Sequence, residues 1–274
     1  MNPTNTIAWK SHFEPAPSGV TYLNHAGSSQ IPLTTTLQGI KYLQWKQHPW
    51  VHDNGEDKEE YNQQVRDLYS QLIQAESCNC IAFAPSTSFG MTMAAQNILR
   101  SGALDKPCRV LITESEEDSN VYPWQNICTC SESSSQAQLE VVLRPDLSIG
   151  SGESWGTAII NALSRQGATP VRVLALSVVH WCEGAYLEVE KVAEHLREMP
   201  LEKRPYFIID GTQSIGALPF DVMALDADFV ACSVHKWLLS PYGTSILYLN
   251  PRHHQSWLPL DQHERYRLGN IEAE

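Results

Sequence analysis

Short apolar runs alternate along the chain with longer segments whose apolar residues recur every three or four positions. The short runs are rich in β-branched residues, which favours strands, whereas the longer segments have the period of an amphipathic helix. The strand-like runs lie at residues 81–83, 109–112, 139–143, 171–179, 206–209, 229–232 and 245–249. The helix-like segments lie at residues 57–75, 88–100, 153–164 and 188–198. The pattern therefore predicts strands connected in several places through helices.

This arrangement predicts the fold class. Strands that are buried on both faces and connected through helices form a mostly parallel sheet, so we expect an α/β fold in which helices flank a mostly parallel seven-stranded sheet. Ligands of such sheets bind where the carboxyl ends of the strands meet the following loops. Ser86, Asp210 and Lys236 closely follow apolar runs and are expected to converge there. The polar stretch at residues 130–138 is expected to be a surface loop.

Composition narrows the possible partners and the compartment. The 274 residues are 42% hydrophobic, enough for one large domain, and their net charge of −12 argues against a nucleic acid or an anionic membrane as partner. The longest apolar runs are far shorter than the roughly 20 residues of a membrane span, and no secretory leader is expected. Seven cysteines, an odd number, suit a reducing compartment, so we expect a cytoplasmic protein.

Two segments in the last third of the chain suggest a chemistry. The apolar run Phe207-Ile208-Ile209 ends in Asp210, and a later run leads to Ser233-Val234-His235-Lys236. Pyridoxal phosphate needs these groups in its site: its aldehyde condenses with a lysine amine, and its pyridine nitrogen becomes an electron sink when a carboxylate keeps it protonated. Lys236 and Asp210 are the candidates for these two roles.

These two segments, together with a motif near the start of the chain and one after Lys236, resemble a known family. The motifs are Tyr22-Leu23-Asn24-His25-Ala26-Gly27, Asp210-Gly211-Thr212-Gln213, Ser233-Val234-His235-Lys236-Trp237-Leu238 and Pro241-Tyr242-Gly243. Their order, over roughly residues 20–250, is similar to that of class V aminotransferase-fold enzymes, a group that includes cysteine desulfurases, kynureninases, isopenicillin N epimerase-like proteins and cysteine-sulfoxide lyases. The resemblance implies the fold type I architecture of pyridoxal phosphate enzymes, a homodimer and an amino acid substrate.

The resemblance also implies a domain organisation and individual roles. It divides the chain into an N-terminal arm at 1–20, a pyridoxal phosphate-binding large domain at 21–250 and the start of a truncated C-terminal segment at 251–274. Lys236 matches the Schiff-base lysine, Asp210 the partner of the pyridine nitrogen, and Gln213 the residue that hydrogen-bonds the phenolic oxygen. The residues matched to the phosphate side are Ser86, Thr87, Ser233 and His235. Ser86 and Thr87 fall at a helix start, whose free amides and positive dipole end favour a phosphate dianion.

Each role has a simpler alternative. Lys236 could be a solvated surface lysine, and His235 a structural hydrogen-bonding residue. Asp210 and the segment 86–88 could serve only as helix N-caps, which favour Asp and Ser.

Metal binding is a weaker alternative. The pairs Cys78/Cys80 and Cys128/Cys130 supply four thiols, but only one residue separates the cysteines of each pair, fewer than zinc sites commonly have. We therefore expect no metal site.

The expected cofactor-stacking position departs from the family pattern. Many relatives place a histidine or an aromatic residue on the cofactor ring, and the corresponding position here is Glu117. A carboxylate cannot stack as a ring does, and its charge opposes a nearby phosphate. His25 and His180 are candidates to cover the ring, although each also suits a core or surface position. The segment 177–184 resembles the strand and loop beside the ring.

The C-terminal end is the second departure. Only 38 residues follow Lys236 (274 minus 236), whereas the family continues into a small domain that brings the arginine for the substrate carboxylate and, in cysteine desulfurases, the persulfide-forming cysteine. Arg265 and Arg267 lie near the end without a supporting motif. The sequence thus predicts a pyridoxal phosphate-dependent enzyme that acts on an amino acid by transamination or by C–S lyase or desulfurase-type chemistry. The alternatives are a degenerate or truncated paralogue that binds the cofactor or a partner subunit without turnover, and an α/β protein whose motifs match by chance.

Overall fold

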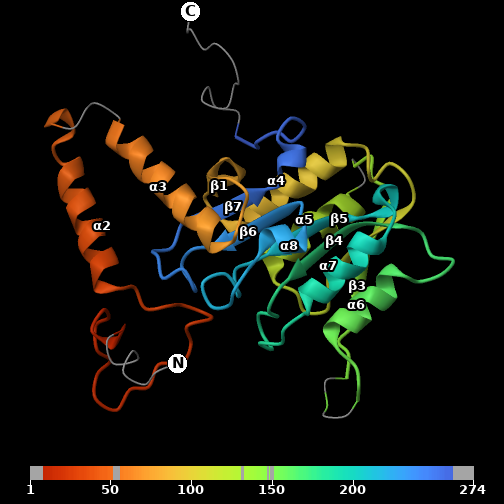
Figure 1. The fold of residues 1–274 in the computed structure, drawn as a ribbon, viewed down its shortest axis with the longest axis horizontal. Helices are drawn as coiled ribbons and strands as arrows, with labels where there is room; N and C mark the ends of the chain where they lie inside the picture. The colour runs from red at the N-terminus through yellow and green to blue at the C-terminus, as the bar shows by residue number, and fades with distance from the viewer. Residues whose placement is uncertain (1–8, 52–55, 131–132, 147, 149–150, 262–274) are drawn as a thin grey trace, which may run out of the picture.

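Seven strands form one sheet in the computed structural model, which describes residues 9–51, 56–130, 133–146, 148 and 151–261. The strands are β1 (Ile81–Ala84), β2 (Cys108–Thr113), β3 (Ala137–Val142), β4 (Val171–Ser177), β5 (Tyr206–Asp210), β6 (Phe229–Ser233) and β7 (Ser245–Leu249). Their order across the sheet is β1-β7-β6-β5-β4-β2-β3 (Figure 1). The pairs β2/β3, β2/β4, β4/β5 and β5/β6 are parallel, and β7 is antiparallel to both β1 and β6. The predicted α/β fold with a mostly parallel seven-stranded sheet is confirmed.

The helices were predicted less completely than the strands. Those of the described residues are α2 (Leu33–Lys46), α3 (Glu56–Leu72), α4 (Thr87–Arg100), α5 (Asp118–Thr129), α6 (Trp155–Leu163), α7 (Val189–Glu198) and α8 (Val222–Leu225). Short 3-10 turns lie at η1 (Pro49–Val51), η2 (Cys78–Cys80), η3 (Leu201–Lys203) and η4 (Pro251–His253). The four predicted helices correspond to α3, α4, α6 and α7 within three residues at each end.

Three helices were not predicted, and one loop was predicted too long. In α5 the interior proline Pro123 argues against a helix, and in α2 consecutive threonines and Gly39 lower helix propensity. The helix α8 is a single turn. The predicted loop at 130–138 ends early because Ala137 already pairs with Cys108 of β2.

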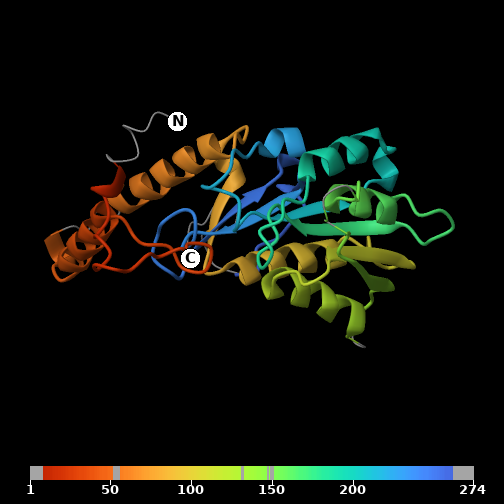
Figure 2. The same ribbon diagram turned by 90° about the horizontal axis from the view of Figure 1, so that it is seen from below.

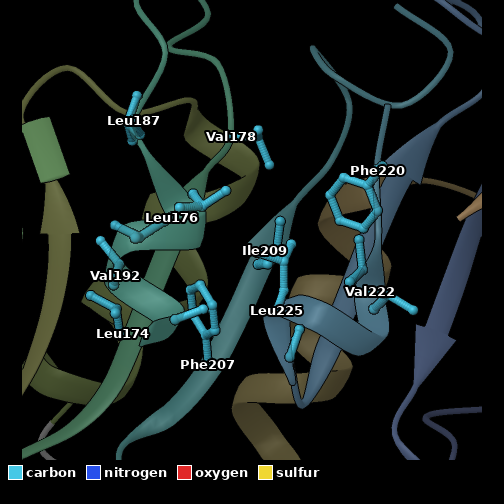
Figure 3. Packing of buried hydrophobic residues seen from close by; sticks show 14 of the residues in the cluster. Leu174, Leu176, Val178, Leu187, Val192, Phe207, Ile209, Phe220, Val222 and Leu225 are labelled. Atoms are coloured by element: carbon cyan, nitrogen blue, oxygen red, sulfur yellow. The ribbon is translucent and has the colours of Figure 1, made fainter. Parts of the chain in front are cut away.

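Successive side chains of each strand point to opposite faces of the sheet, which creates two cores. In β4, Leu174 and Leu176 belong to one core, whereas Val173 and Ala175 belong to the other. The first core is covered by α3, α6, α7 and α8, and Figure 3 shows part of it. The second is covered by α4 and α5, and Figure 2 shows the two helical layers on either side of the sheet. The sheet is therefore buried on both faces and leaves its strand ends as the accessible edge.

The N-terminal part lies outside this layered arrangement. Helix α2 lies beyond α3, away from the centre of the sheet, in both ribbon views (Figures 1 and 2). None of its residues is buried, and apolar side chains such as Leu37 and Leu43 are exposed.

Candidate active site

A pocket of about 160 Å³ opens at the carboxyl ends of the strands. Its lining residues come from the segments that follow β1, β2, β4, β5 and β6. They are Ser86, Thr87, Ser88, Glu117, Ser119, Ser177, Trp181, Asp210, Thr212, Gln213, Ser233, His235, Lys236 and Tyr242. All seven residues singled out from the sequence line this one pocket: Ser86, Thr87, Asp210, Gln213, Ser233, His235 and Lys236. The structure thus brings together side chains that are up to 150 positions apart in the sequence (236 minus 86).

The N-terminus of α4 forms one end of the pocket. Ser86 caps the helix, because its Oγ accepts a hydrogen bond from the amide of Phe89 at 3.2 Å. The hydroxyl of Thr87 contacts that of Ser233 at 2.6 Å. Gly90 lets the helix approach the sheet closely, since a Cβ there would lie 2.5 Å from Leu247. Ser86 is therefore a helix cap, as the simpler alternative proposed, and also a lining residue of a pocket end rich in hydroxyl and amide donors.

Asp210 ends β5 and is almost fully buried. Its Oδ1 accepts a hydrogen bond from the amide of Thr212 at 2.9 Å, and a turn rather than a helix follows, so the N-cap alternative for Asp210 is wrong. Burial raises the pKa of Asp210 to about 7; the Thr212 hydrogen bonds oppose this rise, and the charges of Glu116 and Glu117 add to it. A cationic ligand group beside Asp210 would favour its ionised form.

Gln213 connects three distant segments. Its Nε2 donates to the carbonyl oxygen of Ala26 at 3.1 Å, and its Oε1 accepts from the indole N–H of Trp237 at 3.0 Å. The turn after β5 can pack closely against Trp237 because Gly216, at φ +96°, has no Cβ, which would lie 2.5 Å from the Trp237 carbonyl oxygen. The N-terminal motif around Ala26 is therefore hydrogen-bonded to a residue that lines the pocket.

Lys236 lies in the turn after β6 and is half-buried. Within the described part of the chain its amine forms no ion pair or hydrogen bond. The neighbouring His235 ring lies 4.3 Å from the ring of Tyr242, centroid to centroid. Burial lowers the pKa of His235, and the charge of Lys236 adds to this effect, so the imidazole is neutral at neutral pH. The pocket thus contains an amine that has no ion pair with any carboxylate of the described residues.

Sequence reasoning missed a buried carboxylate below the pocket. Glu116 is only 6% exposed and accepts hydrogen bonds from the Thr113 hydroxyl at 2.8 Å, the Ser177 hydroxyl at 2.5 Å and the Glu117 amide at 3.0 Å. It lies in the acidic run Glu114-Ser115-Glu116-Glu117-Asp118, a pattern that is typical of a solvated loop. The available signal was its position just after β2, where a polar residue can turn into the strand-end site.

Glu117 and Trp181 both line the pocket. The Oε2 of Glu117 accepts a hydrogen bond from the Ser119 amide at 2.8 Å and so caps α5. The indole N–H of Trp181 donates to the carbonyl oxygen of Ser115 at 2.7 Å. Trp181 lies in the segment 177–184 that was expected beside the ring, but only histidines were considered there.

The two candidate histidines do not line the pocket. His180 is fully buried and stacks on Trp155 at a centroid distance of 5.6 Å. His25 packs edge-on against Tyr22. Arg265 and Arg267 lie outside the described residues.

The cysteine pairs form no recognisable metal site. The seven cysteines are free, and the described residues contain no group of three or more His, Cys, Asp or Glu side chains that could hold a metal ion.

Comparison with known proteins identifies the family. The family described as aminotransferase class-V matches residues 21–263. The chain belongs to this family. It is 27% identical over 232 residues to a cysteine desulfurase of Escherichia coli O6:K15:H31 (strain 536 / UPEC), a match that covers 83% of this chain and 52% of that protein. This member of the class-V aminotransferase family therefore spans about half the length of the curated relatives it matches.

Solved structures show the same fold. The apo structure of a cysteine desulfurase from Thermococcus onnurineus NA1 has a TM-score of 0.70 at 23% identity, over 88% of this chain and 56% of that chain. The protein C-DES, a cystine C-S lyase, is similar in two structures. A variant with glycine covalently linked to the PLP cofactor has a TM-score of 0.73 at 18% identity, over 90% of this chain and 61% of that one. The complex with the reaction product cysteine persulfide has a TM-score of 0.71 at 21% identity, over 86% of this chain and 58% of that one. The chain therefore has the fold type I architecture.

The described residues include no helix that is both long enough and apolar enough to cross a membrane.

Proposed function

We propose that the chain binds pyridoxal 5′-phosphate in the strand-end pocket and acts on a sulfur-containing amino acid of the cysteine type, by C–S bond cleavage. The observation that carries this proposal is the convergence of Lys236, Asp210 and the donors at the start of α4 on one pocket. The relatives named as cysteine desulfurases and as a cystine C-S lyase support the choice of substrate and reaction. Transamination of an amino acid remains the second candidate, because the fold alone does not select the reaction.

The residues present fit the cofactor. The helix N-terminus with Ser86 and Thr87, together with Ser233 and the neutral His235, offers donors to a phosphate dianion. The buried Asp210 offers a carboxyl group to a protonated ring nitrogen, which would in turn hold that carboxyl ionised.

The chain's own groups divide the work. When bound, the cofactor supplies an electron sink for charge that develops at the substrate α-carbon. Asp210 would hold the proton on the ring nitrogen, and Gln213 would orient the ring through its side-chain amide. The Nζ of Lys236 would hold the aldehyde group and, when free and neutral, would accept the α-proton of the substrate.

A binding protein without turnover is the alternative in a different class. One observation favours it: the carboxylate of Glu117, the residue at the position where the resemblance expects a ring, lines the pocket. Pyridoxal phosphate binding without release of sulfide, pyruvate or a keto acid would support this alternative.

We further propose a homodimer in the cytoplasm. The exposed apolar side chains of α2 offer surface that a second subunit can cover. Seven free cysteines suit a reducing compartment.

The test uses absorbance, and its variant is Lys236→Ala. The purified chain should develop a visible band with pyridoxal phosphate, and borohydride reduction followed by peptide mapping should place the reduced cofactor on Lys236. Lys236→Ala should lose the band and any sulfide release from cysteine, whereas Lys203→Ala, at an exposed lysine outside the pocket, should retain both. Folded wild-type protein without a band, or a band that survives Lys236→Ala, would refute the proposed site.

A further inference from the structure

Two aromatic side chains, Trp181 and Tyr242, line the pocket. Glu117, at the expected stacking position, instead caps α5 with its carboxylate. Trp181 comes from the segment after β4 and lines the same pocket. It is 47% exposed, so part of its indole surface is open to a ligand.

Two consecutive side chains hold this indole against the β2–α5 connection. His180 Nε2 donates to the carbonyl oxygen of Glu114 at 2.9 Å, and Trp181 Nε1 donates to the carbonyl oxygen of Ser115 at 2.7 Å. Ser115, which accepts the Trp181 hydrogen bond, has a left-handed backbone conformation with φ +54°. The indole is therefore directed across to the connection that contains Glu117.

The segment that carries Trp181 is held in place by hydrogen bonds and by a ring contact. The amide of His180 donates to the carbonyl oxygen of Ala185, and the amide of Gly184 donates to that of His180, both at 2.8 Å. Below the turn, the fully buried His180 ring stacks on Trp155 with an interplanar angle of 11°. A side chain on so well-supported a turn loses little conformational freedom when a ligand covers it.

We propose that Trp181 is the aromatic wall of the cofactor site and packs on the ring of the bound pyridoxal phosphate, the task that the family assigns to the position of Glu117. This inference rests on the proposed function. An indole is well suited to the task, because Asp210 keeps the ring nitrogen protonated and a cationic ring is attracted to the electron-rich indole face. Trp181 is then a positioning residue that acts on cofactor affinity before any substrate is present.

The test measures binding rather than turnover. Pyridoxamine 5′-phosphate is the probe, because it has no aldehyde to condense with Lys236 and reports only non-covalent contacts. Trp181→Ala should weaken its affinity about tenfold, and Trp181→Phe, which keeps an aromatic face, should stay within about threefold of the wild type. Wild-type tryptophan fluorescence should fall on binding, and Trp181→Phe should lose much of that quenching. Trp50→Phe, at an exposed tryptophan in η1, is the matched control and should behave as the wild type.

The outcomes separate this inference from the proposed function. Wild-type protein that binds neither pyridoxal phosphate nor pyridoxamine phosphate refutes the proposed function, and this inference with it. Wild-type binding that Trp181→Ala leaves unchanged refutes the role of Trp181 alone. If Trp181→Phe loses as much affinity as Trp181→Ala, the hydrogen bond to Ser115 rather than the aromatic face is responsible, and the inference is again wrong. Circular dichroism of each variant confirms that it is folded.

Discussion

The strand-end pocket and helix α2 differ in which side chains are buried: polar ones are buried around the pocket, and apolar ones are exposed on α2. Around the pocket, polar groups are buried and hydrogen-bonded, as Glu116 is by its chain neighbours Thr113 and Glu117 and by Ser177 of β4. In α2 no residue is buried, although Leu37, Ile40 and Leu43 form an apolar stripe at helical spacing. Burying polar groups is costly unless they are hydrogen-bonded, and a large exposed apolar stripe is typical of a surface that a partner covers. The contrast indicates that the pocket is built within the chain, whereas α2 is shaped for contact with something outside the described residues.

The largest contrast should appear in stability. Phe207 is 2% exposed in the core that Figure 3 shows, whereas Leu43 is 68% exposed on α2. Phe207→Ala should lower the free energy of unfolding by about 4 kcal/mol, because it removes a buried ring and leaves a cavity. Leu43→Ala should change it by less than about 0.5 kcal/mol. Urea denaturation followed by circular dichroism checks both values, and a large loss in Leu43→Ala would mean that α2 is packed in solution.

The next effect is the loss of stability that the buried Asp210 carboxyl group causes when it is ionised. Because the pKa of Asp210 is raised to about 7, the folded chain holds its proton more tightly than the unfolded chain does. Lowering the pH from about 8 to 4 therefore relieves a penalty that is present when Asp210 is ionised. Asp210→Asn should make the cofactor-free chain more stable than the wild type at pH 8, by on the order of 3 kcal/mol, and the difference should vanish near pH 4.

Thermal melts of both proteins across this pH range provide the measurement. Because the two proteins share every other titratable group, the pH dependence of those groups cancels when the two stabilities are subtracted. If the wild type is more stable than Asp210→Asn at pH 8, the buried Asp210 carboxylate does not destabilise the cofactor-free chain. The same variant should bind pyridoxal phosphate more weakly, so stability and binding should change in opposite directions.

The sequence predicted the sheet and the polar residues on the strand ends, and physical reasons explain this success. Apolar runs report burial directly, and a residue such as Asp210 that follows a buried run must lie at the edge where ligands bind. Glu116 and Trp181 were missed because their positions depend on two loops meeting in space. Ser177 and Glu116 are 61 residues apart, and Trp181 and Ser115 are 66 residues apart. A local sequence pattern does not predict contacts between residues so far apart. An acidic run next to a strand therefore suggests a solvated loop when its hydrogen-bond partners are unknown.

Changes in the apolar stripe of α2 are expected to have little effect on stability but to alter self-association. The double change Leu37→Ser and Leu43→Ser should leave the free energy of unfolding of a monomer within about 1 kcal/mol of the wild type, because both side chains are exposed. It should nevertheless shift the sedimentation profile of the chain toward the monomer, since the proposed homodimer would lose apolar contact area. A matched polar change on the same helix, Gln38→Ser, should leave the profile unchanged. Equal self-association in the wild type and the double variant would show that α2 does not form the subunit contact, and the exposed stripe would then need a different partner.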